Sequence, residues 1–301
     1  MPECTRPPSQ PPTIRILEPG DEAALEAFLL PRVTSSMFLL GNMRTSGLRD
    51  TGEPYEGTYA ARFEGDHIIG VVAHYWNGML IVQAPGYEES LGRAAAQASR
   101  RAIAGIIGPA GQVTVAYRAL EVDEDSVQMD ETEILYALDL DALVVPEALR
   151  DGRVVGRRIE PQDVERVTAW SVAYNVEAIG AEETPELWES RRASAERSLD
   201  EGDTWILEHE GEPVAMSGFN TAIAEAVQVG GVYTPPALRR RGYGRCVVAA
   251  SLLDARAEGV SQAILFTGEA NLPAQRAYTA LGFEPIGDYR LVILRDPIPA
   301  P

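Results

Sequence analysis

The fold of this 301-residue chain is decided by one stretch, Arg239-Arg240-Arg241-Gly242-Tyr243-Gly244-Arg245. It follows a β-branched run at 227–234, which predicts a strand, and it opens an apolar periodic run at 243–258, which predicts a helix ending at Gly259. The two glycines leave backbone N–H groups free to face one anion, and the helix N-terminus adds partial positive charge. Because the chain has a net charge of −19, four local arginines predict a phosphate-binding turn. A solvated basic turn is the alternative.

A second block follows at a defined distance. Residues 263–267 predict a buried strand, and the segment 271–278 predicts a short helix. Pro273 suits the first turn of that helix, and Gly282 suits the position just past its end. The sequence therefore predicts a strand, basic turn, helix, strand and short helix in succession.

Together the two blocks resemble the GCN5-related N-acetyltransferase (GNAT) superfamily. The acyl-CoA signature of that superfamily, Gln or Arg-x-x-Gly-x-Gly or Ala, is matched by Arg239, Gly242 and Gly244. The second matching block consists of Asn271, Ala274, Tyr278, Gly282 and Phe283. The resemblance covers about residues 155–296, and it implies a mixed α/β fold that binds acetyl-CoA.

The order of predicted elements repeats along the chain. Residues 142–157 look like a connector, and the length suits two domains. We therefore expect tandem GNAT-like domains, each a mostly antiparallel sheet flanked by helices. The expected parts are a disordered Pro-rich tail at 1–12, a degenerate domain at 13–141, a linker at 142–155, a catalytic domain at 156–296 and a disordered tail at 297–301.

The first copy lacks the basic turn. Its residues 84–89, Ala-Pro-Gly-Tyr-Glu-Glu, place acidic groups where phosphate-binding groups are expected. The first domain is therefore predicted to have lost CoA binding, and to serve a structural role or to wall off the substrate.

Composition excludes several classes of protein. The acidic chain would repel nucleic acid at long range, although it mildly favours cationic partners such as amines. No apolar run of membrane-spanning length and no signal pattern is evident. Cys4 and Cys246 form no disulfide framework, and the three histidines lack metal-ligand spacing, so we expect a cytoplasmic protein without a metal site. All 26 basic residues are arginine, which suggests a high-GC bacterial source. Nothing predicts the oligomeric state.

The resemblance implies how acetyl-CoA is held. Backbone N–H groups of residues 241–245 bind the diphosphate with help from the arginines, and the strand at 232–234 pairs with the pantetheine arm. Gly230-Gly231 predicts a bulge or a close approach, with a simple twist as the alternative. The implied cofactor-binding residues are Val232, Tyr233, Thr234, Arg239, Arg240, Arg241, Gly242, Tyr243, Gly244, Arg245, Asn271, Ala274 and Tyr278.

The resemblance also implies Tyr278 as the general acid that protonates the leaving thiolate, although the ring could instead pack on the CoA arm. The base does not follow the family pattern, because the position of the family glutamate holds Gln228, which cannot accept a proton. Glu177, Glu225, Glu269 or a water chain are the candidates.

The acceptor side is expected between the first two helices of the second domain. Trp170, Tyr174, Glu177 and Gln228 are the candidate substrate-binding residues, although Trp170 could be core and Glu177 solvated. The implied function is transfer of an acetyl group to the amine of a small molecule by direct attack in a ternary complex. A non-catalytic acyl-CoA-binding or regulatory protein is the alternative. Aminoacyl transfer from tRNA is disfavoured by the acidity.

Overall fold

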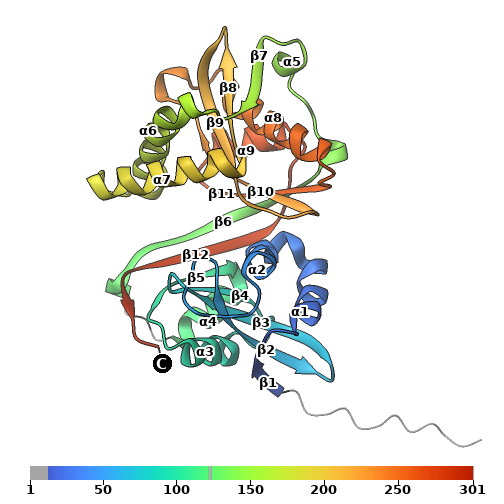
Figure 1. Cartoon of the computed structure of the whole chain (residues 1–301), viewed down its shortest axis with the longest axis vertical. Coiled ribbons are helices and arrows are strands. Elements are labelled where there is room, and N and C mark those ends of the chain that lie inside the picture. The colour runs from blue at the N-terminus through green and yellow to red at the C-terminus, as the bar shows by residue number, and fades with distance from the viewer. Residues whose placement is uncertain (1–12, 121, 123, 301) are drawn as a thin grey trace, which may run out of the picture. The chain divides into compact units, whose positions relative to one another are not determined.

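The computed structural model describes residues 13–120, 122 and 124–300, drawn as ribbons in Figure 1. The expected tail at 1–12, with Cys4, lies outside the described residues. The chain forms two compact units, and the first comprises the residues up to Leu135 together with those from Gly287 onward. The second unit runs from Tyr136 to Ile286.

The first unit is built around an antiparallel sheet with one parallel pair. Its elements are β1 Thr13–Ile16, α1 Glu22–Leu29, α2 Val33–Ser46, β2 Gly57–Glu64, β3 His67–Tyr75, β4 Met79–Gln83, α3 Glu88–Ser99, β5 Ile103–Pro109, α4 Ala110–Ala119 and β6 Val127–Asp139. The strand order is β1-β2-β3-β4-β5, and β4 pairs with β5 in parallel. Leu80, Leu91 and Ile106, from β4, α3 and β5, meet in its core.

The second half of the chain repeats this order. After the short helix α5 Glu147–Arg150 come β7 Val154–Arg158, α6 Val164–Tyr174, a π-helical turn Asn175–Ile179, α7 Pro185–Glu201, β8 Thr204–His209, β9 Glu212–Ala222, β10 Ala226–Tyr233, α8 Tyr243–Ala257, β11 Gln262–Gly268, α9 Leu272–Thr279 and β12 Glu284–Ile298. Here β10 and β11 form the parallel pair. Each repeat thus has the order β-α-α-β-β-β-α-β-α-β, which confirms the tandem α/β prediction.

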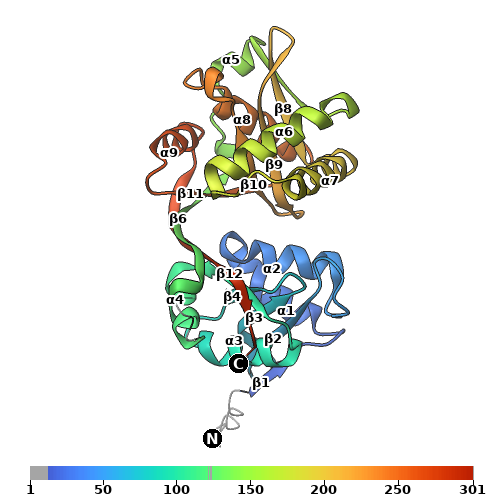
Figure 2. The same ribbon diagram turned by 90° about the vertical axis from the view of Figure 1, so that its left-hand side faces the viewer.

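Helices cover both faces of the sheet in the second unit. Trp205 and Leu207 of β8 pack with Cys246 of α8, whereas Ile206 between them packs with Val167 of α6. Successive strand residues point to opposite faces, so this alternation places α8 on one face and α6 on the other. Figure 2 shows these helices around β8 and β9.

The last strand of the chain belongs mostly to the first unit. In β12, residues from Tyr289↔Pro109 to Ile293↔Gly105 pair antiparallel with β5. Residues from 297 onward, expected to be disordered, partly continue this strand, because Ile298 pairs with Ile103. The second repeat therefore supplies a strand to the sheet that begins with the first repeat.

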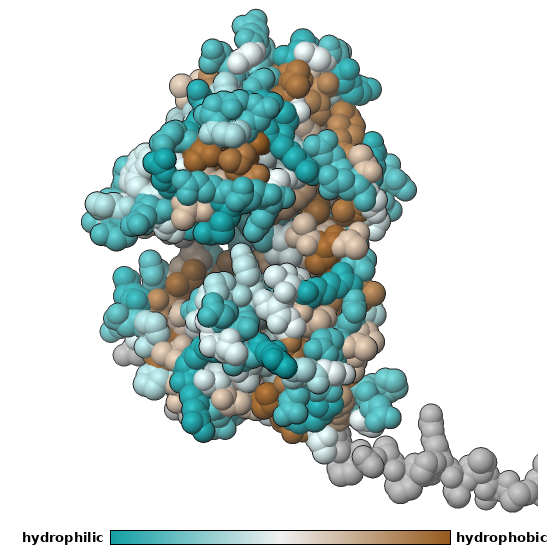
Figure 3. All heavy atoms as spheres, viewed as in Figure 1, coloured by the Kyte–Doolittle hydropathy of each residue, from teal (hydrophilic) through white to brown (hydrophobic). Residues whose placement is uncertain are grey.

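Besides the four-residue α5, two helices were not expected from the sequence, α2 and α4. The helical segment Glu22–Ser46 is long and apolar enough to cross a membrane by length and composition alone, although no such run was expected. The structure divides this segment at a 3-10 turn that contains Pro31. Leu25 of α1 and Leu40 of α2 are fully buried within the unit. On the face drawn in Figure 3, hydrophilic residues surround smaller hydrophobic groups.

Candidate functional site

The turn between β10 and α8 leaves the helix N-terminus open. Arg240 and Gly242 both adopt left-handed backbone conformations, with φ of 63° and 81°. Gly242 is the N-cap of α8, and no side chain caps the helix. A Cβ at Gly244 would touch Thr234 Oγ1 at 3.5 Å, so glycine keeps the space beside the end of β10 clear. The first N–H groups of α8 are therefore available to an anion, as the sequence predicts.

Three guanidinium groups around this turn lack a carboxylate partner. Arg240 and Arg241 are exposed, and within residues 13–120, 122 and 124–300 neither forms an ion pair. Arg245 folds back so that its Nη2 lies 3.8 Å from the position of a Cβ on Gly242. Its Nε is buried and finds no hydrogen-bond partner in the described chain. Uncompensated arginines of this kind suit a phosphate group.

Beside the turn, β10 presents an unpaired stretch of backbone. Pairing of β10 with β11 runs from Ala226↔Gln262 to Gln228↔Ile264 and goes no further in the described residues, although both strands continue. The register with β9 shifts between Gly230 and Tyr233, and Gly231 has a φ of 58°. The predicted bulge is therefore present. A Cβ on Gly230 would also lie 2.1 Å from Asn220 Nδ2. The free edge can pair with a ligand that carries amides.

Gln228 lies where the two parallel strands stop pairing. Its side chain is 3% exposed, and Nε2 donates a hydrogen bond to the Val229 carbonyl at 2.9 Å. Its Oε1 is buried without a partner in the described chain. An unpaired buried carbonyl is costly, so a ligand or water that donates a hydrogen bond there would be stabilised.

The short helix α9 begins near the same end of the sheet. Because β11 runs parallel to β10, its carboxyl end lies at the edge where the arginine turn begins. Asn271 Oδ1 accepts a hydrogen bond from Ala274 N–H at 3.3 Å and so caps α9. Tyr278 is 9% exposed and packs edge-on against Phe283, with ring centroids 6.0 Å apart.

The three candidate carboxylates occupy different places. Glu177 accepts hydrogen bonds from both terminal nitrogens of Arg239, at 2.5 and 2.6 Å. These bonds hold the pKa of Glu177 below its usual value, which weakens it as a base. Glu225 precedes β10, at the opposite end from the turn, whereas Glu269 follows β11 at the same end as the turn.

The aromatic candidates hold α6 against the sheet. Trp170 and Tyr174 pack on the cluster that includes Tyr233, and the rings of Trp170 and Tyr233 are 6.4 Å apart. Tyr233 is 8% exposed. These contacts give both residues of α6 a packing role, and a role toward an acceptor stays a prediction.

In the first unit, the loop between β4 and α3 is equivalent to the arginine turn, and two side chains of the unit accept hydrogen bonds from its N–H groups. Gln112 Oε1 accepts a hydrogen bond from Ala84 N–H at 2.6 Å, just after β4. Glu88 Oε1 accepts one from Gly86 N–H at 3.0 Å. The acidic loop was visible in the sequence, but Gln112 was missed because α4 was not expected. Two N–H groups of this loop are therefore already occupied, and the loss of CoA binding by the first unit stays a prediction.

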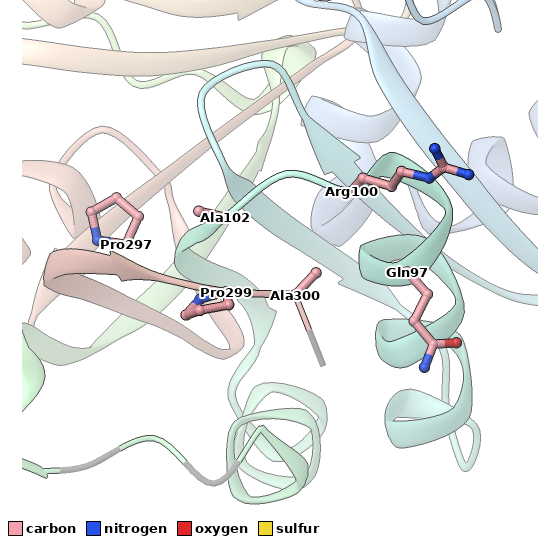
Figure 4. Close-up of a pocket in the computed structure, with 6 residues that line it drawn as sticks. All are labelled: Gln97, Arg100, Ala102, Pro297, Pro299 and Ala300. Atoms are coloured by element: carbon pink, nitrogen blue, oxygen red, sulfur yellow. The ribbon is translucent and has the colours of Figure 1, made fainter.

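Other sites are few in the described part of the chain. No group of three or more His, Cys, Asp or Glu residues could hold a metal ion there. A hollow of about 600 Å³ lies in the first unit (Figure 4). Its lining residues are Gln97, Arg100, Ala102, Pro297, Pro299 and Ala300.

Comparison with known families agrees with this geometry. Residues 165–283 match the model of the acetyltransferase (GNAT) family. The chain therefore carries a GNAT domain that contains the arginine turn, the free edge of β10 and α9, and it is an acyltransferase. Proteins of this family generally bind acetyl-CoA. No curated protein sequence matches the chain.

Solved structures share the fold across both units. A Drosophila protein is 13% identical, covers 93% of this chain and 98% of its own, and has a TM-score of 0.65. A GCN5-related N-acetyltransferase from Kribbella flavida is 18% identical, with coverage of 88% and 95% and a TM-score of 0.58. A tandem GNAT protein from the clavulanic acid biosynthesis pathway is 14% identical, with coverage of 95% and 99% and a TM-score of 0.55. At these identities the likeness concerns the fold alone.

Proposed function

We propose that this protein transfers an acetyl group from acetyl-CoA to the amine of a small molecule, using the site in its second unit. The observation that carries the proposal is the arginine turn. There, an uncapped helix N-terminus and three unpaired guanidinium groups lie next to an unpaired strand edge. Such a combination suits a ligand with a diphosphate at one end and amides along its length.

The residues present fit that cofactor. The backbone N–H groups of residues 241–245 would hold the diphosphate, with Arg245 turned toward the same place. The edge of β10 from Val229 to Tyr233 would receive the pantetheine amides. Acetyl-CoA supplies the acyl group as a thioester, activated toward attack by an amine.

Two side chains have defined tasks in the proposed transfer. Tyr278 Oη would donate its proton to the leaving sulfur. Gln228 Oε1 would accept a hydrogen bond from the attacking nitrogen, which orients it but cannot remove its proton. With the pKa of Glu177 lowered and Glu225 at the far end of β10, Glu269 or water is left as the acceptor of that proton.

A second candidate function is a non-catalytic acyl-CoA-binding or regulatory protein. The observation in its favour is Gln228, an amide at the position where relatives use a glutamate. Transfer with Gln228 in place requires the proton to leave by another route. A screen of amines for CoA release separates the two, because a binding protein would release none.

The first test is calorimetric titration of the full chain with acetyl-CoA. We expect one site per chain, because Glu88 and Gln112 occupy the loop N–H groups of the first unit. Two sites would contradict the role we give to these bonds. Absence of binding would contradict the proposed function as a whole.

A further inference from the structure

Among the arginines of the turn, Arg239 has the partner that the other three lack. Its two terminal nitrogens donate to the two oxygens of Glu177, and its Nε donates to the Thr234 carbonyl at 2.9 Å. This arginine is also the first residue of the acyl-CoA signature. In the structure, the guanidinium therefore faces a carboxylate of the same chain.

Glu177 belongs to the segment where the acceptor side is expected. It lies in the π-helical turn Asn175–Ile179, directly after the helix that carries Trp170 and Tyr174. Single π-helical turns are frequent at functional sites. Glu177 and Arg239 are 62 positions apart in sequence, so their ion pair ties the acceptor-side segment to the cofactor turn.

The ion pair is of a kind that a diphosphate can displace. The two side chains are 39% and 49% exposed, and exposed pairs contribute little net stability. A diphosphate carries more charge than a carboxylate and also suits the fork of donors on arginine. At this turn it would gain the helix N-terminus as well.

We propose that Arg239 exchanges Glu177 for the diphosphate of acyl-CoA, and that the freed Glu177 then attracts the positively charged acceptor. The inference rests on the proposed function and deepens it. Binding of the cofactor would leave the carboxylate of Glu177 unpaired on the acceptor side. The acceptor class that such a carboxylate attracts is a cationic amine. Acceptor affinity should therefore depend on whether the cofactor is bound.

Calorimetric titration with CoA tests the exchange. Glu177→Gln and Glu177→Ala remove the competitor, so we expect CoA to bind about two- to fivefold more tightly, as loss of an exposed ion pair allows. Glu258→Gln is the matched control, because it breaks another exposed arginine pair, Arg158–Glu258, away from the turn. It should leave the affinity unchanged. In an Arg239→Gln background, Glu177→Gln should have no further effect.

Hydrogen exchange of residues 175–184 gives a readout that does not depend on turnover. In the wild type, CoA should speed exchange in this segment, whereas in Glu177→Gln exchange should already be fast without CoA. Suppose that CoA binds the wild type, that Glu177→Gln binds CoA no more tightly, and that hydrogen exchange of the segment is unchanged or slowed by CoA. The proposed exchange of partners by Arg239 would then be wrong, whereas the proposed function would stand. Absence of CoA binding by the wild type would contradict both.

Discussion

Tyr278 is the residue on which the proposed chemistry depends most. It lies on α9, mostly buried, beside Phe283 and close in sequence to the cap residue Asn271. The helix is only eight residues long, so its cap and its contact with Phe283 do much to orient the phenol.

We expect Tyr278→Phe to lower kcat by about 10²-fold or more, because a positioned general acid contributes about 10²–10⁴-fold. The affinity for acetyl-CoA should change little, since the ring and its packing remain. Steady-state kinetics and calorimetry measure the two effects separately. Equal loss of both would indicate that Tyr278 acts in cofactor binding.

Asp163 couples stability to pH at the start of α6. Burial of this carboxyl raises its pKa. The hydrogen bonds that it accepts from Arg157 and from Glu160 N–H lower the pKa by more, so that the pKa lies below the ordinary value. A depressed pKa in the folded state stabilises the protein above the unfolded-state pKa of about 3.9. That contribution is lost as the pH falls through the lower, folded-state pKa.

Asp163→Asn should therefore destabilise the protein by about 1–3 kcal/mol at neutral pH, because Arg157 loses a charged partner. The difference from the wild type should shrink as the pH falls below about 4. Denaturant unfolding at neutral pH and at pH 3 measures it. A difference that is constant with pH would show that the carboxylate charge does not matter.

At the scale of elements, β12 lies close against β5. A Cβ on Gly105 of β5 would lie 2.4 Å from the Val292 carbonyl and 2.8 Å from Met79 Sδ. A glycine at this position lets three strands approach each other. Arg290 on β12 adds a bidentate ion pair with Asp130 of β6.

Gly105→Val should therefore lower the free energy of unfolding by about 1–3 kcal/mol, as overpacking of a core does. Gly111→Ala on α4 is the control, because nothing lies within 4 Å of its Cβ and alanine favours a helix. Thermal unfolding of both variants measures the change in stability. An unchanged melting temperature for Gly105→Val would mean that the strands can move apart at little cost.

The four elements around the arginine turn, β10, α8, β11 and α9, were predicted within one residue, because β-branched runs, caps and glycine stops mark their ends. The two helices that were missed, α2 and α4, lack such signals. Helix α2 contains serines and a central Gly41, and α4 begins directly after β5 without a loop. Their helical form depends on burial against the sheet of the first unit.

At the scale of the whole molecule, the two repeats share strands of one chain. Residues 289–298 lie in the last strand of the second repeat but pair with β5 of the first unit. The domain limits expected from the sequence, 13–141 and 156–296, would separate β12 from this partner. Independent folding of those ranges stays a prediction.

A split of the chain tests whether the units are separable. We expect residues 143–301 alone to unfold without a cooperative transition, because β12 would present an unpaired edge. Co-expression with residues 1–142 should restore cooperative unfolding and binding of one acetyl-CoA. A stable, CoA-binding fragment 143–301 would show that the pairing of β5 with β12 is dispensable.

The sequence by itself determined the arginine-rich turn that opens α8 and the bulge at Gly230-Gly231, because each depends on residues close together in the chain. Only the tertiary structure decided the partners of distant residues. These are the pairing of Glu177 with Arg239, the closure of the first unit's loop by Gln112, and the place of β12 in the first unit. Local propensity and spacing act over a few residues, whereas such contacts arise only when the folded chain brings remote segments together.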